Sequence, residues 1–578
     1  MDVDAGLRLG PMLRHVTETT ATIWVETDAP CLVSVVADGH RADVPTFTVH
    51  GHHYAVCELT DLPPGSALPY EVRISGVTVW PEPDSAYPPS LARTLDHTAP
   101  TRLLFGSCHM STGHTPEAVR EYGVDMLRAE ALRLAESRRA HPPDGAAAGG
   151  EPTYLLMIGD QVYADELQPS MREFLRESRA AADSAGRAGA RPPEDEVVFF
   201  DEYAELYRQA WIDPDIRWLL STVPTLMLFD DHDIRDDWNT SGTWRREIAE
   251  NPWWSHRITS GLGAYWIYQH LGNLSPDERA NDPVLDKVLA EEDAGEVVDS
   301  FAWRANEDPG SYRWSHRHDI GGTRLVMVDT RCGRDVGDDR RRGMLGHSES
   351  AWLDDQLTGD VDHLVVASTL PYLMPMAVHH LEAWNEAVCA GTWGSALRGP
   401  GERLRQAVDL EHWSAFQRSF RAVADAVVRV AAGERGAPPA SVLFLGGDVH
   451  FSYLARARPR GRGWPATEGT TIAQLVCSPL RNELPALVGK LTRVAAWRVT
   501  GAAVAALARL AGVRRPDLAW RLDAGPWYGN ALATLTLDGR HAEVAWDHAV
   551  ASSADGPPDP EADVRPEPRE LARHRLTG

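Results

Sequence analysis

Hydrophobic residues in the later part of this chain gather in short uninterrupted runs bounded by glycine or charge. Such runs are typical of strands that are buried on both faces. Four of them lead into residues that can bind a metal. These four segments are Leu103–Cys108, Tyr154–Asp160, Thr225–Asp233 and Val442–His450. Ligands lie beyond the carboxyl ends of the strands in layered α/β folds, so the pattern predicts one shared metal site.

Before residue 97 the apolar pattern alternates instead and is broken by turns. Segments 20–25, 32–36, 57–59 and 70–74 are expected strands, which together predict a small β-sandwich. Residues 81–100 are rich in proline and are expected to form a linker. The predicted organisation is a β-sandwich over residues 1–97, a catalytic α/β domain over 98–550 and a disordered tail over 551–578, which is rich in Pro, Asp, Glu and Arg.

Composition narrows the classes of partner. A net charge of −26 argues against nucleic acid as a stable partner, because binding it needs a basic surface. The six cysteines include no CxxC pair and resemble reduced intracellular thiols. The start has no signal-peptide pattern and no twin arginine, and the most apolar stretch, 494–513, is interrupted by Arg498 and Arg509. We therefore expect a cytoplasmic protein without a membrane-inserted segment, and a packed helix at 494–513.

The residues at the strand ends have the chemistry of a binuclear metal site. Asp160 can bridge two ions, and Tyr163 follows it by one turn. A phenolate from Tyr163 and a thiolate from Cys108 favour ferric iron, or zinc. Asp448 and His450 are two apart on an extended segment and can face the same site. Individually, each motif has a simpler explanation, such as a helix cap, a small buried thiol or an exposed acidic turn. Their order, each after a buried strand, favours the site.

The motifs together resemble those of a known family. They are Ser107-Cys108, Gly159–Tyr163, Asp230–Asp233, Asp329–Arg331 and Gly447–His450. In this order they resemble the alkaline phosphatase D (PhoD-like) family of metallophosphoesterases, which is similar to the purple acid phosphatases. The resemblance covers most of residues 101–550. It implies a four-layer α/β sandwich preceded by a small fibronectin-like β-sandwich.

The resemblance also implies roles for individual residues. A first metal would be held by Cys108, Asp160, Tyr163 and His450. A second would be held by Asp160, Asp231 and Asp448, and an oxygen-only site suits calcium, magnesium or manganese. Iron and calcium are the implied pair, with zinc, manganese or magnesium as alternatives. His232 would contact phosphate or protonate the leaving group, and Arg235 would clamp phosphate.

The expected function is a metal-dependent phosphoric ester hydrolase that acts on a small-molecule phosphate monoester or diester. A hydroxide bridging two metals would attack phosphorus in line. The chain departs from the family pattern at Asp233, where Glu is usual, and at Asp236, where Asn is usual. Asp329 and Arg331 either bind near the site or form a buried salt bridge, which we favour. The competing hypotheses are a catalytically silent binding module and a metal-free hydrolase with paired carboxylates, in which Cys108 and Tyr163 would have no role.

Overall fold

The computed structural model describes residues 5–141, 150–184, 192–337, 341–460, 469–483, 498–551 and 562–577. The N-terminal part is a β-sandwich, as expected. One of its sheets has the order β1 (Leu7–Val16), β2 (Ala21–Thr27), β6 (His52–Leu59), β5 (Phe47–Val49). The other has the order β4 (His40–Pro45), β3 (Leu32–Ala37), β7 (Ala67–Ile74), β8 (Val77–Trp80), with β9 (Leu91–Arg93) also on β7. The expected linker therefore contains a strand of this sandwich.

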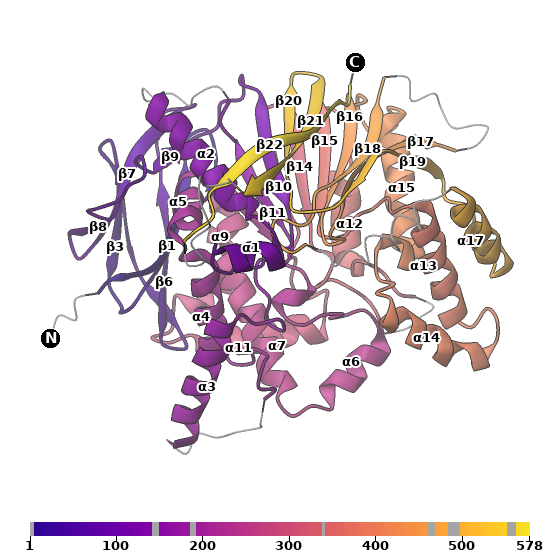
Figure 1. The fold of residues 1–578 in the computed structure, drawn as a ribbon, viewed down its shortest axis with the longest axis horizontal. Helices are drawn as coiled ribbons and strands as arrows, with labels where there is room; N and C mark the ends of the chain where they lie inside the picture. The colour runs from indigo at the N-terminus through magenta and orange to yellow at the C-terminus, as the bar shows by residue number, and fades with distance from the viewer. Residues whose placement is uncertain are drawn as a thin grey trace.

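Two larger mixed sheets follow. The first has the order β12 (Thr225–Leu228), β11 (Tyr154–Ile158), β10 (Thr101–Gly106), β20 (Leu532–Asp538), β21 (His541–Ala551), β22 (Pro566–Arg575). The second has the order β13 (His316–Ile320), β14 (Thr323–Val328), β15 (His363–Ser368), β16 (Ser441–Gly446), β18 (Thr471–Val476), β17 (Ser452–Pro459), β19 (Leu518–Trp527). Strands β10, β11 and β12 are parallel, as are β14, β15, β16 and β18. Figure 1 shows the N-terminal sandwich at one end of the molecule and α13, α14 and α17 at the other.

Helices cover the two sheets. They are α1 (Pro116–Tyr122), α2 (Met126–Ala140), α3 (Pro169–Ser184), α4 (Phe200–Trp211), α5 (Pro214–Thr222), α6 (Gly242–Ala249), α7 (Trp254–Ala264), α8 (Leu271–Asn273), α9 (Pro276–Ala280), α10 (Leu285–Val288), α11 (Gly295–Glu307), α12 (His347–Gln356), α13 (Met376–Cys389), α14 (Arg398–Ala407), α15 (Gln417–Ala431) and α17 (Arg498–Leu510). The 3-10 helices are η1 (Asp231–Asp233), η3 (Ser395–Leu397) and η4 (Trp413–Ala415), and η2 (Tyr265–His270) is a π-helix. Within the described residues, α17 is the helix expected at 494–513, and it packs along α13.

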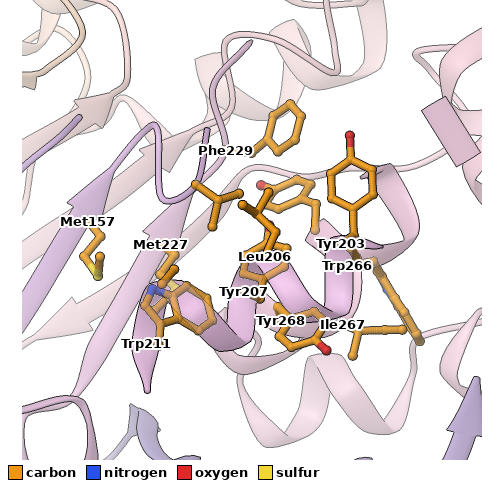
Figure 2. Close-up of a cluster of buried hydrophobic side chains, with 14 of the residues drawn as sticks. Met157, Tyr203, Leu206, Tyr207, Trp211, Met227, Phe229, Trp266, Ile267 and Tyr268 are labelled. Carbon is orange, nitrogen blue, oxygen red and sulfur yellow. The ribbon is translucent and has the colours of Figure 1, made fainter. Parts of the chain in front are cut away.

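The alternation of side chains along each buried strand produces four layers. On β10 and β11, Phe105 and Leu156 belong to the core shared with the second sheet, whereas Leu104 and Leu155 belong to a separate helix-covered core. Successive side chains of a strand point to opposite faces, so a run that is apolar throughout fills both cores. Figure 2 shows the helix-side core, where Tyr207 of α4 stacks on Tyr268 of η2 with ring centroids 4.4 Å apart. The four-layer fold inferred from the sequence is confirmed.

The tail prediction is wrong for residues 566–575, which form β22 and pair with β21. Charged composition suggested disorder, but an edge strand needs only main-chain pairing and one buried anchor. Arg573 bonds to Glu543 across the strands at 2.5 Å, and Leu576 is buried in the core between the sheets. Residues 552–561 lie outside the described part of the chain.

A cluster of buried histidines lies where the N-terminal sandwich meets the catalytic domain. His15 of β1 and His318 of β13 have ring centroids 5.2 Å apart, and Nδ1 of His316 is 2.7 Å from Nε2 of His318. His270 of η2 packs edge-on against Trp314 at 5.1 Å. Burial, with nearby Arg313 and Arg14, lowers the pKa of His270 to about 3, and burial with Arg317 lowers the pKa of His318 to about 3. These rings are therefore neutral in the folded protein at neutral pH.

We predict that acid destabilises the fold through this cluster. In the unfolded chain each histidine takes up a proton near pH 6.5, whereas His270 and His318 resist protonation until about pH 3. Above pH 6.5 these two histidines leave the free energy of unfolding unchanged. Below pH 6.5 each of them lowers the free energy of unfolding by roughly 1.4 kcal/mol per pH unit. His270→Phe, which keeps the aromatic packing, should flatten the dependence of the urea midpoint on pH between 6.5 and 4. His541→Phe, at an exposed site, is the control; equal slopes for wild type and His270→Phe would contradict the prediction.

Candidate metal centre

The carboxyl ends of strands from both large sheets lie together at one edge. Each of the strands β10, β11, β12 and β16 is followed two residues after its end by a candidate ligand: Cys108, Asp160, Asp230 and Asp448, in that order. The Ser107 hydroxyl accepts a 2.8 Å hydrogen bond from the Asp448 amide, which ties the end of β10 to the end of β16 across the two sheets. The strand ends predicted from the apolar runs are therefore neighbours in space.

Three carboxylates form the centre of this edge. One carboxylate oxygen from each of Asp160, Asp230 and Asp448 lies within 4.8 Å of the other two. Asp160 and Asp230 are fully buried. Burial, followed by repulsion from Asp230, raises the pKa of Asp160 well above its usual value. Burial raises the pKa of Asp230 to about 6 even though Arg331 lowers it. Three carboxylates this close are costly unless a cation lies between them.

Donors of a different kind surround Asp160. The Cys108 thiol lies 3.2 Å from Asp160 Oδ2, and Tyr163 packs with Cys108 and Met110 in a small buried cluster. Burial lowers the pKa of His450 to about 4, so its imidazole is neutral and can act as a ligand at neutral pH. Thiolate, phenolate and imidazole are ligands for iron or zinc, whereas the carboxylate trio suits harder cations.

Unpaired polar atoms test whether this donor set fits metal ions. Four buried atoms have no hydrogen-bond partner of ordinary geometry among the described residues. They are Asp160 Oδ1, the Tyr163 hydroxyl, Asp230 Oδ2 and His450 Nδ1. Buried polar atoms are normally paired, so four ligand-type atoms left unpaired by the described residues in one place are suited to binding cations. The residues present fit bound metal ions.

The backbone is held in an uncommon conformation at these positions. Cys108, Asp160, Asp448 and His450 have φ of 58°, 50°, 64° and 54°. Positive φ is rare outside glycine and clusters where tertiary structure overrides local preference, often at functional sites. The preceding Gly159 has no room for a side chain, since a Cβ would lie 2.9 Å from Asp230 Oδ2.

Asp231, a second-metal ligand by resemblance, lies next to the carboxylate trio and is not one of its three members. Its Oδ1 lies 3.0 Å from Arg331 Nη2, and its Oδ2 accepts a 2.8 Å hydrogen bond from the Asp237 amide. Asp230, which the sequence reasoning did not select, is the member of the carboxylate trio. The DDHD motif pointed to this segment, but spacing cannot tell which of two adjacent carboxylates turns inward.

Arg331 joins the acidic groups into one network. It bonds to Asp230 and lies 3.0 Å from Asp231, 2.5 Å from Glu411 and 3.7 Å from Asp448. The favoured Asp329–Arg331 salt bridge is wrong. The side chain of Asp329 accepts hydrogen bonds from the backbone amides of Arg331 and Cys332 at 3.0 and 2.7 Å. Asp329 shapes the turn, and Arg331 faces the site.

Two residues of the centre come from a segment without a recognisable motif. Nε2 of His412 lies 3.5 Å from Asp448 Oδ2, while Nδ1 lies 2.6 Å from Glu382 of α13. Glu411 also pairs with Arg334 at 3.0 Å. Residues 411 and 412 follow a loop rather than a buried strand, so the rule that located the other candidates could not find them.

His232 lies beside the carboxylates and is oriented by a neighbouring acid. Its Nδ1 is 3.0 Å from Asp165 Oδ1, and its ring packs on Tyr163 with centroids 4.8 Å apart. Burial alone would lower the pKa of His232, but Asp165 and then Asp160 raise it well above the usual value. Asp165, two residues beyond Tyr163, had not been singled out from the sequence.

Arg235 lines an open cavity of about 850 Å³ next to His232. Asp165, Asp236 and Trp253 line the same cavity. The Arg235 guanidinium lies 3.4 Å from Glu196 and 5.8 Å from the centre of the Trp253 ring. Its side chain is thus held at the wall of the cavity by Glu196 and Trp253. Asp233, the departure from the usual Glu, caps η1 through a 3.0 Å bond from the Asp230 amide.

No curated protein matches the chain. Among solved structures it is similar to one described as "Structure of PhoD", at 12% identity and a TM-score of 0.57, over 98% of this chain and 92% of that one. A maltogenic amylase from S. marinus and a type III pullulan hydrolase from Thermococcus kodakarensis reach TM-scores of only 0.14 and 0.11. Residues 4–92 match a domain of unknown function, DUF7800, and residues 144–500 match the PhoD-like phosphatase family. This second match spans more than half of the sequence, and the chain therefore belongs to the PhoD-like phosphatase family.

Proposed function

We propose that the chain is a metal-dependent phosphoesterase that hydrolyses small-molecule phosphate monoesters or diesters at the strand-end centre. The observation that carries the proposal is the close trio of Asp160, Asp230 and Asp448 next to Cys108, in which Asp160 and Asp230 are buried and each have an unpaired oxygen. Membership of a phosphatase family supplies the reaction class. A metal-free hydrolase with paired carboxylates would leave the Cys108 thiol and the unpaired Tyr163 hydroxyl without a role.

Different residues of the chain would hold two metal ions. One metal ion would be held by Cys108, Tyr163, His450 and Asp160. A second would be held by Asp160 and Asp448, together with Asp230 or Asp231. Bound ions supply positive charge for the phosphate and lower the pKa of an attacking water. Calcium, magnesium or manganese suits the oxygen-only side, and iron or zinc the side with Cys108.

Other residues would position these ligands and the substrate. Arg331 holds Asp230 and Asp231 in place and offsets their repulsion, and His412 orients Asp448. His232, with Asp165 on its Nδ1, would present Nε2 to the leaving oxygen. Arg235 would meet a phosphate oxygen only after release from Glu196, so we assign it a secondary binding role.

Metal analysis and hydrolysis assays test the proposal together. The native protein should contain two or more metal ions per chain and hydrolyse a panel of phosphate monoesters and diesters. Exhaustive chelation should abolish hydrolysis, and adding the metals back should restore it. Ferric iron on Tyr163 would give a visible charge-transfer band that Tyr163→Phe removes and Tyr203→Phe, at another buried tyrosine, keeps. Full activity without metal would support the carboxylate hydrolase instead, and bound metal without hydrolysis of any ester would support the silent binding module.

Metal removal should also change stability, which provides a readout independent of turnover. The carboxylate trio is repulsive without a cation, so the thermal midpoint should fall on chelation and recover on reloading. A midpoint that does not respond to metal would show that the trio holds none.

A further inference from the structure

A strongly basic groove lies at the end of the molecule opposite the N-terminal sandwich. It has a volume of about 750 Å³ and is lined by residues of α13, α17 and β19. Figure 1 shows α13 and α17 at this end of the molecule. Its charged lining consists of Arg460, Arg509, Arg514, Arg515 and Arg521, with Asp523 as the single acid. This concentration of arginine is unexpected in a chain with a net charge of −26.

Most of the arginines in this basic groove have no local counterion among the described residues. Within the described residues, Arg509, Arg514 and Arg515 form no ion pair, and Asp523 is shared between Arg456 at 2.9 Å and Arg521 at 3.4 Å. His380 also lines the groove, and its pKa is lowered by burial and by the nearby positive charge. Burial, and then Arg460 and Arg509, lower its pKa to about 4. The groove therefore presents positive charge that is available to an anionic ligand.

An apolar stripe on α17 adjoins the arginines. Ala503, Ala506 and Leu510 are exposed at helical spacing, and α17 contains no acidic residue. Leu510 is 77% exposed, the highest value among the exposed large hydrophobic residues of the described chain. Trp393, 36% exposed, donates a 3.3 Å hydrogen bond from its indole nitrogen to the Leu510 carbonyl. The outer face of a surface helix is normally polar, so this face is suited to an apolar partner.

We propose that this face docks the protein on the surface of an anionic lipid bilayer. The arginines would bind lipid phosphates while Leu510 and Trp393 enter the boundary between headgroups and acyl chains, where leucine and tryptophan are favoured. The rest of the acidic protein would be repelled by the same surface, so charge complementarity selects this one orientation. In the described part of the chain, no helix is long and apolar enough to cross a membrane. The protein would lie on the bilayer and not span it.

Vesicle sedimentation with the full chain tests this docking. Vesicles containing phosphatidylglycerol should bind the protein, and vesicles of phosphatidylcholine alone should not. The triple variant Arg509→Glu, Arg514→Glu, Arg515→Glu should bind the anionic vesicles roughly 100-fold more weakly, since each lysine or arginine near an anionic surface contributes about fivefold or more. A second triple variant is the control. It carries Arg176→Glu, Arg565→Glu and Arg569→Glu, which change the net charge equally at exposed sites elsewhere.

A separate substitution distinguishes a lipid surface from a soluble polyanion. Leu510→Ser keeps every charge and should still weaken vesicle binding several-fold, while binding to heparin stays unchanged. Full vesicle affinity in Leu510→Ser would overturn the lipid proposal in favour of a charge-only site. Equal binding to both vesicle types, or no effect of the first triple variant, would also overturn it. Hydrolysis of a soluble phosphate ester by all variants should match wild type, which shows that they are folded.

Discussion

Asp160→Asn should lose bound metal and phosphate-ester hydrolysis together. Both metal affinity and activity should fall by more than 100-fold, which is the upper end of the loss for residues that only support a metal ligand. Asp160 is buried, its Oδ1 has no partner among the described residues, and its Oδ2 lies 3.2 Å from the Cys108 sulfur. Asp160 is thus a member of the carboxylate trio that also contacts the Cys108 thiol. An amide has one acceptor oxygen and no charge, so it cannot bridge two cations. Elemental analysis and turnover, measured on the same sample, check this result.

The substitution is suited to the test because the fold should survive it. Asparagine has the shape of aspartate and tolerates positive φ, which residue 160 requires. It also removes one of three repelling charges, so the metal-free variant should be at least as stable as metal-free wild type. Asp360→Asn is the matched control, at φ 62° near the amino end of β15, and should leave metals and activity unchanged. A folded Asp160→Asn protein with near-normal turnover would remove Asp160 from the bridging role.

His232→Ala should keep both metals while turnover falls by roughly 10²- to 10⁴-fold, the range for a residue that protonates a leaving group. Nδ1 of His232 lies 3.0 Å from Asp165, and Nε2 lies 3.8 Å from Asp236, beyond hydrogen-bond distance, so Nε2 can still donate to a substrate. The loss should be larger for alkyl phosphate esters than for nitrophenyl esters, because a good leaving group needs little protonation. Rate measurements with both ester types, on samples of known metal content, provide the check.

Two further variants make the assignment of His232 specific. Asp165→Asn should reproduce the leaving-group dependence in weaker form, because the amide orients the ring without its charge. His256→Ala, at an exposed position of α7, should leave both rates unchanged. Loss of metal from His232→Ala would make His232 a ligand, and equal slowing of both ester types would reduce its role to electrostatic stabilisation.

The family, the four-layer catalytic fold and the preceding β-sandwich could all be predicted before the structure. Apolar runs such as Tyr154–Ile158 are long enough to identify buried strands, and residues at the ends of parallel strands must share an edge. The tail was predicted to be disordered, but residues 566–575 form β22. This strand depends on main-chain pairing with β21, which leaves little trace in the amino-acid composition.

The family and the strand ends that meet at one edge could be predicted from the sequence alone, because short motifs directly after buried strands carry both. Which side chains pair with one another became visible only in the folded structure. Arg331 faces Asp230 and not Asp329, and Asp230 rather than Asp231 joins the trio. It also brought His412 to Asp448 from a loop with no motif. These choices depend on side-chain direction and on contacts between segments far apart in the chain, which local sequence patterns do not encode.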